Sequence, residues 1–393
     1  MVSKKLEATE THSYKIGIFV DKWLAGGIES YITNLVEELN QASDLTIEIL
    51  TFYKHYEGFD ARLQKAKVPI RQVFQGEFGQ SRIHRFLFGA KALKNRLRNS
   101  QYDLVHFNSF NAMSFNYYQA CEELAIPCIF HSHNSNIEKG FGRTFKQLIH
   151  RFYRHKYRNQ PFDRWACSDL AANWLFKDNP EVELITNGIH FEKFAFNKDH
   201  RQHIRKQLNI TDETQLIGTI GRLNNQKNPF FLFEIFNCLK GNNRYKFLLI
   251  GEGPLKEQVM KKITELGLNK QIIYIPQTNE VEHYLAAMDI FLLPSVFEGN
   301  PVSSIEAQAN GLTVLLSDQI TTFAKITETT CFLPIDKADR WVKAMKQAEN
   351  YQEETRIQRS AFFEKSNYTV KKSSQIVYDN YIEILNRGDS NHL

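Results

Sequence analysis

The chain has 393 residues, of which 42% are apolar and 24% are charged. That length accommodates two or three domains, each with its own core, and the composition is that of an ordinary soluble globular protein. No stretch approaches the roughly 20 apolar residues of a membrane span, and the polar N-terminus predicts no signal peptide. The five cysteines are scattered without a C-x-x-C pair, which argues against a disulfide or zinc framework and favours a reducing cytosol.

The net charge of +5 is unevenly distributed. Residues 78–102 and 140–160 contain no acidic residue, and in both stretches basic residues alternate with Phe, Leu, Ile and Tyr. This pattern suits a basic amphipathic helix on an anionic membrane surface, so an anionic membrane is a candidate partner. A solvated basic face explains the pattern equally well. Nucleic acid is not expected, because no nucleic-acid motif accompanies the charge.

Strands and helices alternate along the first half of the chain. Apolar spacing predicts a strand over 15–20 and an amphipathic helix over 28–40, joined by a loop with Gly26 and Gly27. Further strands are expected at 45–52, 103–107, 126–130, 164–167 and 182–186, with helices between them. The chain then turns polar and charged at 187–201, where we place a domain boundary.

A second alternating series follows the boundary. Strands are expected at 216–220, 245–250, 272–275, 290–293, 313–316 and 331–333, and the chain from 337 to 386 is expected to be mainly helical. Such alternation favours an α/β fold with two parallel sheets in tandem, each covered by helices. Ligands of such sheets bind beyond the carboxyl ends of the strands, where the unusual residues of both halves lie.

The stretch 289–311, DIFLLPSVFEGNPVSSIEAQANG, reads as strand, loop and short helix. The helix is expected to start near Ser303, with Glu306 in its first turn and Gly311 just past its end. Free amides at the helix start suit a phosphate, and a carboxylate suits vicinal hydroxyls. Ser303 and Glu306 also fit a capping box, which needs no ligand.

Five motifs, in this order, resemble retaining glycosyltransferases of family 4, including enzymes that build capsular polysaccharides and exopolysaccharides. They are GGIESY, TNGIHFEKF, GRLNNQKN, LLIGEGP and FEGNPVSSIEAQANG, and they span roughly residues 15–319. The resemblance implies the GT-B fold, in which two Rossmann-like domains face each other across a cleft. We expect an acceptor-binding domain over 1–195 and a nucleotide-sugar-binding domain over 196–370. A C-terminal helix from about 371 to 393 is expected to pack back on the first domain.

The resemblance also assigns site residues. Its donor-binding set is Gly27, Arg222, Lys227, Glu298, Gly299, Asn300, Pro301, Val302, Ser303 and Glu306. The catalytic candidates are His133, Arg222, Lys227 and Glu298, and the acceptor side receives Gly26 and His131. The charges of Arg222 and Lys227 suit a sugar-nucleotide diphosphate, whose negative charge grows as it leaves. A structural role for either histidine remains open.

No D-x-D motif occurs in the sequence, so neither a metal nor another cofactor is expected. Two positions depart from the family pattern. His190 stands where an aspartate is frequent in the family, and Gln277 stands where Gly-Arg-like residues are frequent, near the expected position of the nucleotide base.

We therefore expect a cytoplasmic enzyme, peripheral on the inner face of the cell membrane if its basic stretches bind lipid. It would transfer a hexosyl group from a nucleotide sugar, preferably a UDP-sugar, to a lipid-linked or cell-surface glycan. The alternatives are a non-catalytic relative that binds a glycan or a partner transferase, and a sugar-nucleotide epimerase.

Overall fold

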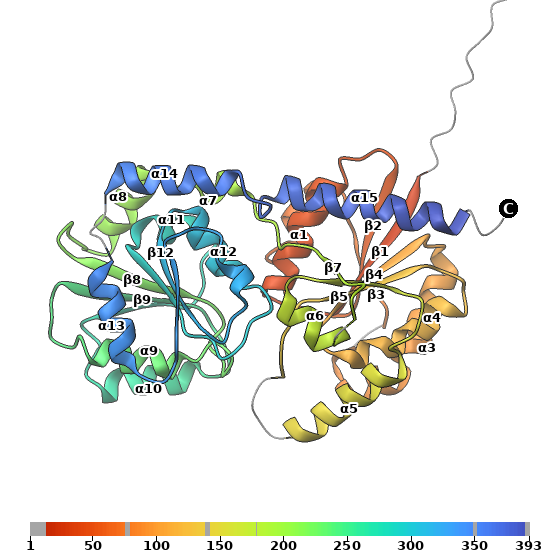
Figure 1. Ribbon diagram of the computed structural model, residues 1–393, viewed down its shortest axis with the longest axis horizontal. Coiled ribbons are helices and arrows are strands. Elements are labelled where there is room, and N and C mark those ends of the chain that lie inside the picture. The colour runs from red at the N-terminus through yellow and green to blue at the C-terminus, as the bar shows by residue number, and fades with distance from the viewer. Residues whose placement is uncertain (1–12, 75–78, 138–141, 178, 349–351, 390–393) are drawn as a thin grey trace, which may run out of the picture.

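The computed structural model describes residues 13–74, 79–137, 142–177, 179–348 and 352–389. Two parallel sheets, of 7 and 6 strands, stand side by side and are flanked by helices (Figure 1). The predicted α/β class with two parallel sheets in tandem is confirmed.

The first sheet has the strand order β3-β2-β1-β4-β5-β6-β7. Its strands are β1 (Tyr14–Trp23), β2 (Leu45–Lys54), β3 (Ile70–Gln72), β4 (Leu104–Ser109), β5 (Cys128–Ser132), β6 (Asp163–Ala166) and β7 (Glu183–Leu184). The accompanying helices are α1 (Gly27–Leu39), α2 (Asp60–Lys65), α3 (Arg82–Ser100), the 3-10 helix η2 (Ala112–Tyr117), α4 (Tyr118–Glu122), α5 (Arg143–Lys156) and α6 (Asp169–Phe176).

The second sheet has the order β10-β9-β8-β11-β12-β13. Its strands are β8 (Gln215–Ile220), β9 (Tyr245–Ile250), β10 (Ile272–Ile275), β11 (Ile290–Leu293), β12 (Thr313–Ser317) and β13 (Thr330–Leu333). The remaining helices are α7 (Phe191–Phe194), α8 (Lys198–Gln207), α9 (Pro229–Asn237), α10 (Lys256–Glu265), α11 (Val281–Ala287), α12 (Val302–Ala309), η3 (Thr322–Ala324), α13 (Ala338–Gln347), α14 (Glu353–Glu364) and α15 (Val370–Asp389).

Each sheet contains a point where the strand order reverses. In the first sheet this point lies between β1 and β4, and in the second it lies between β8 and β11. Crevices at such points, beyond the carboxyl ends of the strands, are where open α/β sheets bind ligands. The loops after β1, β4, β8 and β11 are therefore the candidate ligand-binding loops.

The C-terminal helix α15 runs along the first sheet, far in sequence from the strands it covers (Figure 1). It packs against α1, and its side chains Val377, Tyr381, Ile384 and Leu385 belong to the same buried cluster as Ile16, Ile18 and Val20 of β1. The first sheet therefore completes its core with the end of the chain.

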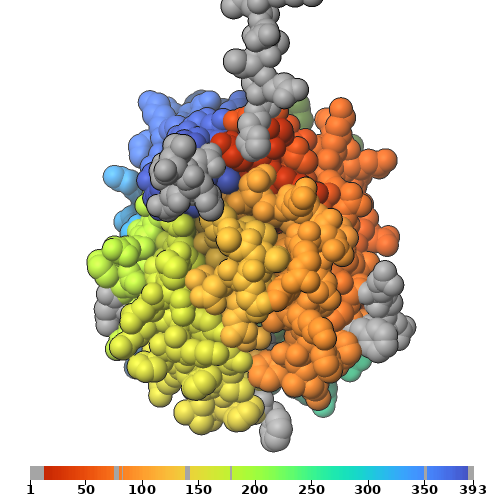
Figure 2. Space-filling model, turned by 90° about the vertical axis from the view of Figure 1, so that its right-hand side faces the viewer, coloured from red at the N-terminus to blue at the C-terminus, as the bar shows by residue number. Residues whose placement is uncertain are grey.

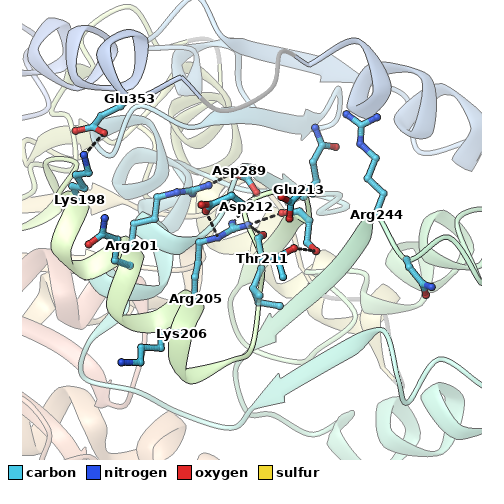
Figure 3. Close-up of a pocket in the computed structure, with 15 residues that line it drawn as sticks. Lys198, Arg201, Arg205, Lys206, Thr211, Asp212, Glu213, Arg244, Asp289 and Glu353 are labelled. Carbon is cyan, nitrogen blue, oxygen red and sulfur yellow. Dashed lines mark hydrogen bonds and ion pairs between the residues drawn. The ribbon is translucent and has the colours of Figure 1, made fainter.

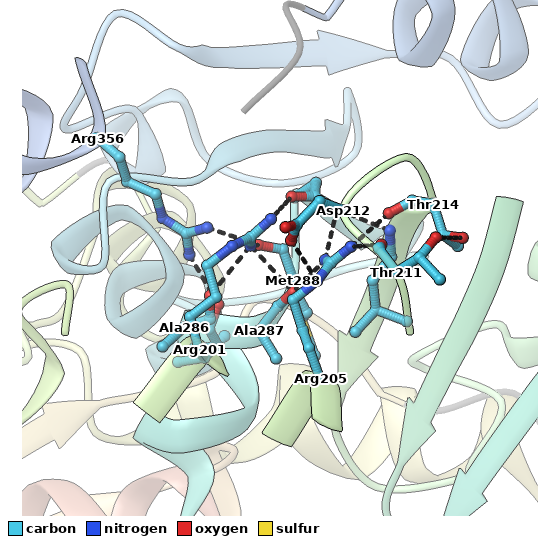
Figure 4. A network of polar contacts seen from close by, with 12 residues as sticks. Arg201, Arg205, Thr211, Asp212, Thr214, Ala286, Ala287, Met288 and Arg356 are labelled. Atoms are coloured by element: carbon cyan, nitrogen blue, oxygen red, sulfur yellow. Dashed lines mark hydrogen bonds and ion pairs between the residues drawn. The ribbon is translucent and has the colours of Figure 1, made fainter. Parts of the chain in front are cut away.

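Helix α8 begins in the segment 187–201, which the sequence marked only as a polar boundary, and continues beyond it. Its Arg201 and Arg205 are buried because their guanidinium groups bind the chain just before β11. Arg201 donates to the carbonyls of Ala287 and Met288, both at 3.1 Å, and to the Asp289 carboxylate at 2.7 Å (Figure 4). The two arginines therefore hold α8 against the chain just before β11, and a pattern of polar residues does not reveal such buried charges.

These arginines also line a hollow of about 1150 Å³ (Figure 3). It lies beside Gln215 and Asp289, at the amino ends of β8 and β11 and thus opposite the ligand-binding edge. The guanidinium group of Arg205 donates hydrogen bonds to the carbonyl oxygens of Ala287, Thr211 and Thr214 and to the carboxylate of Asp289. We therefore assign this hollow a structural role.

The predicted element types hold for most of the chain, and the corrections are local. The helix expected after the strand at 103–107 is split into η2 and α4. The strand expected at 182–186 is reduced to the two residues of β7. Helix α2 and strand β3 were not predicted. Helices α13, α14 and α15 confirm the helical C-terminal region.

Candidate active site

The loop between β11 and α12, together with the first turns of α12, carries most of the predicted donor-binding residues. Pro301 is the N-cap of α12, so the helix begins at Val302 and places Glu306 in its second turn. Proline suits a helix start because its φ is fixed and it has no N–H to leave unpaired. The predicted start at Ser303 is therefore late by one residue, and the capping box is wrong, because the N-cap has no side-chain bond. Gly311 follows the helix with φ +72°, as predicted.

This loop is held by residues of the first domain. Ser135 donates from Oγ to the carbonyl of Glu298 at 2.8 Å. Asn187 donates to the carbonyl of Asn300 at 3.2 Å, and Asn300 donates to the carbonyl of Cys167 at 3.4 Å. The two halves of the predicted site thus meet at one seam.

Gly299 marks the tightest point of the seam. A Cβ at this position would lie 2.3 Å from the carbonyl oxygen of His133 and 3.1 Å from Sγ of Cys167. Only glycine allows the two backbones to come this close. The structure therefore brings His133 and Gly299 together, although they come from different sheets.

Lys227 and Glu298 form an ion pair, with Nζ and Oε1 2.8 Å apart. The side chain of Glu298 is only 9% exposed. Gln226 steadies it by donating to Glu298 Oε2 and to the carbonyl of Phe297, both at 3.1 Å. Two predicted catalytic candidates are thus in direct contact, and a buried carboxylate is neutralised by a lysine that keeps part of its surface in solvent.

Arg222 stands exposed just after β8, and its charge acts on Glu29 of α1. Glu29 is buried, and its Oε1 accepts from the backbone N–H of Leu24 at 3.0 Å. Burial raises the pKa of Glu29 to about 7, although that hydrogen bond and the Arg222 charge act to lower it. An arginine of the second domain therefore faces a carboxyl group of the first.

Two helix N-termini converge at the same place. Gly26 is the N-cap of α1, and a Cβ on Gly27 would lie 3.6 Å from Cγ2 of Val302, the first residue of α12. The first amides of a helix have no partner within the helix, and its dipole makes that end positive. Two such ends in contact favour an anion between the domains.

His133 has a defined protonation state. The side chain of Asn108 donates to the carbonyl of Phe19, so its Oδ1 faces His133 Nε2 at 2.7 Å and accepts a hydrogen from it. Nδ1 of His133 is then a lone-pair acceptor, buried and without a hydrogen-bond partner among the described residues. Burial lowers the pKa of His133 to about 3, so the ring is neutral at pH 7.

Two family models match the chain. The model described as Glycosyltransferase Family 4 matches residues 25–193, and the one described as Glycosyl transferases group 1 matches residues 200–362. Together they cover both sheets in the order of the family. The chain belongs to the family 4 type of GT-B glycosyltransferases.

Similar proteins agree with this assignment. The putative glycosyltransferase EpsF of Bacillus subtilis is 26% identical over 304 residues, which is 75% of this chain and 77% of that protein. An Escherichia coli protein named UDP-Gal:alpha-D-GlcNAc-diphosphoundecaprenol alpha-1,3-galactosyltransferase is 25% identical over 58% of this chain and 60% of its own length. The crystal structure of Anabaena Alr3699/HepE in complex with UDP-glucose superposes with a TM-score of 0.77 at 15% identity, covering 94% of this chain and 99% of that one. This last likeness concerns the fold alone.

In this glycosyltransferase Glu306 lies in the second turn of α12, near charged groups of α7 and α11. The charged groups that act on it are Lys193, which lowers its pKa, and Glu282, which raises it. Burial dominates and raises the pKa of Glu306 to about 8, even though some of its side-chain surface stays exposed. Ser303, one turn before it, is half-buried. Glu306 therefore forms a second polar position of the site, beside α7 and α11.

The glycosyltransferase also buries a histidine pair behind His133. Nδ1 of His131 lies 3.1 Å from Nε2 of His106, whose Nδ1 lies 2.7 Å from the hydroxyl of Tyr381 on α15. The side chains of His131 and His106 are completely buried. These contacts favour the structural alternative for His131, which packs against the ring of His133 with centroids 4.0 Å apart.

Sequence reasoning missed Glu29, His106, Asn108 and Gln226 in this site. Glu29 is the third residue of α1, and a glutamate at that place of a helix is itself a recognisable signal. The other three depend on neighbours distant in sequence. Gln277, one of the departures from the family pattern, donates across the domains to the Tyr56 hydroxyl at 3.0 Å.

The other departure has an assigned contact. His190 Nε2 lies 3.0 Å from Oε2 of Glu37 on α1, so it ties the inter-domain connection to the first domain. Among the described residues no cluster of three or more His, Cys, Asp or Glu is arranged to hold a metal ion. The roles of the predicted site residues stay predictions.

Proposed function

We propose that the protein is a retaining hexosyltransferase that uses a UDP-sugar and extends a lipid-linked or cell-surface glycan in polysaccharide biosynthesis. One observation carries the proposal: the N-termini of α1 and α12 meet beside the Lys227–Glu298 pair and His133. The named activity of the Escherichia coli relative and the roles of its polysaccharide-building relatives support the donor and acceptor class.

The site suits the departure of a diphosphate. The converging helix ends and the side chains of Arg222 and Lys227 supply fixed positive charge where negative charge grows. The bond between the anomeric carbon and the phosphate oxygen breaks while the acceptor oxygen bonds to the same face. The acceptor's hydroxyl proton passes to the leaving phosphate oxygen. No metal is required, because protein groups provide the positive charge.

His133 serves as a positioning group in this mechanism. Its neutral ring cannot neutralise the leaving phosphate, and its low pKa makes it a weak base. Its buried Nδ1 instead accepts a hydrogen bond, for which a hydroxyl of the donor sugar is the natural partner. Glu306 accepts from the ribose hydroxyls of the nucleotide.

The acceptor side faces two helices with exposed apolar side chains. On α5 these are Phe145, Leu148 and Phe152, which are 67%, 58% and 62% exposed, and on α3 they include Ile83 and Leu87. Both helices pack on η2, and their surfaces lie near each other on the lower part of Figure 2. The described part of the chain has no helix that is long and apolar enough to span a membrane. Peripheral attachment on the cytoplasmic side is our proposal for this face.

The donor is tested by calorimetric titration with UDP-, GDP- and ADP-glucose. We expect the UDP-sugar to bind best, with binding unchanged by EDTA. With a lipid-linked acceptor, the product should keep the anomeric configuration of the donor, as read by NMR, and Arg222→Ala should lower turnover about 10²–10³-fold. Binding without any transfer would favour the non-catalytic alternative. Loss of transfer on EDTA treatment, restored by a metal, would overturn the metal-free mechanism.

The membrane face is tested by flotation with vesicles containing phosphatidylglycerol. The double substitution Phe145→Ser and Phe152→Ser should release the protein, because it removes the largest exposed apolar groups of α5. Phe362→Ser is the matched control, since this residue is 56% exposed on α14 of the other domain. Equal flotation of all three proteins would contradict peripheral binding through α5.

A further inference from the structure

A small pocket with polar and aromatic lining opens at the carboxyl ends of β1 and β4, next to the seam. Its volume is about 130 Å³, and its lining includes Asp21, Arg85, Asn108, Phe110 and Asn116. It shares a wall with the predicted catalytic centre, because Asn108 lines the pocket and also accepts the 2.7 Å hydrogen bond from His133. No residue that we assigned to the donor lines it.

The two charged residues that line the pocket form an ion pair whose carboxylate is the more exposed member. Arg85 is only 5% exposed, and it donates to the carbonyls of Gly79 at 2.6 Å and Gln80 at 2.9 Å. Its Nε lies 3.3 Å from Oδ2 of Asp21, whose side chain is 34% exposed. The Arg85 guanidinium is thus buried, while the Asp21 carboxylate is partly exposed to the pocket. An exposed carboxylate accepts hydrogen bonds from hydroxyl groups and repels anions, so the pocket suits a neutral ligand rich in hydroxyl groups.

The remaining lining fits the same chemistry. The Tyr117 hydroxyl donates weakly to Asp21 Oδ1 at 3.5 Å, so the carboxylate is held from two sides. Asn116 is half-buried, and its side chain has no hydrogen-bond partner among the described residues. Phe86 and Phe110, 43% and 41% exposed, add aromatic surface at the edge. A fixed carboxylate, an amide and aromatic faces together recognise a sugar ring.

We propose that this pocket binds the terminal sugar of the acceptor and presents its hydroxyl to the donor beside His133. This inference rests on the proposed function. Asp21 and Asn116 bind hydroxyl groups of that sugar, and an aromatic ring covers its apolar face. The charged part of a lipid-linked acceptor lies outside, toward the basic and apolar surfaces of α3 and α5. An uncharged glycoside is therefore sufficient to occupy the pocket.

The test uses octyl glucoside, octyl galactoside and octyl N-acetylglucosaminide below their micelle concentrations, with octanol as the sugar-free control. Binding to the full chain is measured by saturation-transfer NMR, and UDP-glucose binding is measured separately by calorimetry. Asn116→Ala and Phe110→Ser should each weaken glycoside binding about tenfold, which is the loss expected for one good contact. UDP-glucose affinity should stay unchanged in both.

The matched controls are Asn380→Ala and Phe362→Ser. Asn380 is a half-buried amide that lines a different hollow beside α15, and Phe362 is similarly exposed on α14. Both controls should bind glycosides like the wild type. Unchanged glycoside binding in Asn116→Ala and Phe110→Ser, no binding of any glycoside, or equal binding of octanol would each overturn the proposal. If the wild-type protein bound the glycosides but did not bind UDP-glucose, the proposed function would be contradicted, while the pocket would still be a glycoside-binding site.

Discussion

Glu306 and Glu29 are carboxyl groups whose pKa values are raised by burial to about 8 and about 7. A carboxyl group that must be ionised to accept two ribose hydroxyls makes ligand binding depend on pH. The free protein holds most of Glu306 in its protonated form at pH 7. The free energy needed to remove this proton is then subtracted from the free energy of ligand binding. This free-energy cost of deprotonation becomes smaller as the pH rises.

We therefore expect UDP-glucose to bind more tightly as the pH rises from 6.5 toward 8.5, by up to about tenfold per pH unit below the pKa. Glu306→Gln should bind more weakly, and its affinity should vary less with pH, because the titrating group is gone. Calorimetric titration across this range measures both effects. If Glu306→Gln kept the wild-type pH profile, another group, with Glu29 as the first candidate, would be responsible.

The Lys227–Glu298 pair tests whether a contact is structural or catalytic. Lys227→Met removes the counter-charge of the Glu298 carboxylate, which is 9% exposed and keeps its hydrogen bond from Gln226. The free energy of unfolding should therefore fall by about 2 kcal/mol, a reduced value because Lys227 is partly exposed. Adding Glu298→Gln should restore most of that stability without restoring transfer. Stability is measured by chemical denaturation and sugar transfer by an activity assay. If the double variant recovered transfer as well as stability, the ion pair would act only in folding.

At the scale of elements, the seam holds the loop before α12 against the first domain. Gly299→Ala places a methyl group 2.3 Å from the His133 carbonyl, and neither backbone can move without separating the domains. We expect donor affinity to fall at least about tenfold. Ser135→Ala is the milder comparison, since it removes one hydrogen bond of 2.8 Å to the same loop and should cost only a few-fold. Equal donor affinities in the two variants and the wild type would contradict this view of the seam.

Elements with strong local signals could be predicted from the sequence, and elements held by distant partners could not. The apolar stripe of α1 and the glycine after α12 gave correct positions, because both depend on nearby residues. Helix α8 escaped prediction because Arg201 and Arg205 are buried only through the chain at 286–289. The capping box failed for a local reason, since Pro301 starts the helix before Ser303.

The same distinction applies to the site. Motif order assigned Lys227, Glu298, Gly299 and His133 to one site. The structure adds that Lys227 contacts Glu298 and that Gly299 lies against His133, although these pairs are far apart in sequence. It did not find Asn108, whose side chain orients His133, or Arg85, whose burial leaves Asp21 exposed in the pocket. Those contacts arise from the packing of separate strands and helices, and no spacing rule encodes them.

At the scale of the molecule, the end of the chain stabilises its beginning. Tyr381 on α15 is completely buried in the core of the first sheet, and its hydroxyl lies 2.7 Å from His106. Helix α14, just before it, belongs to the second domain, where Phe363 is completely buried. One continuous C-terminal segment therefore supports both domains (Figure 1).

This arrangement predicts that the domains can be destabilised separately. Tyr381→Ala should lower the free energy of unfolding of the first domain by about 3–5 kcal/mol, and Tyr381→Phe by only about 1 kcal/mol, because the ring is kept and one hydrogen bond is lost. Hydrogen exchange measured by mass spectrometry should then rise in β1, β4 and α1. Phe363→Ala is the mirror control and should raise exchange in β8, β11 and β12. Equal increases in both sheets for either variant would mean that the two domains unfold as one unit.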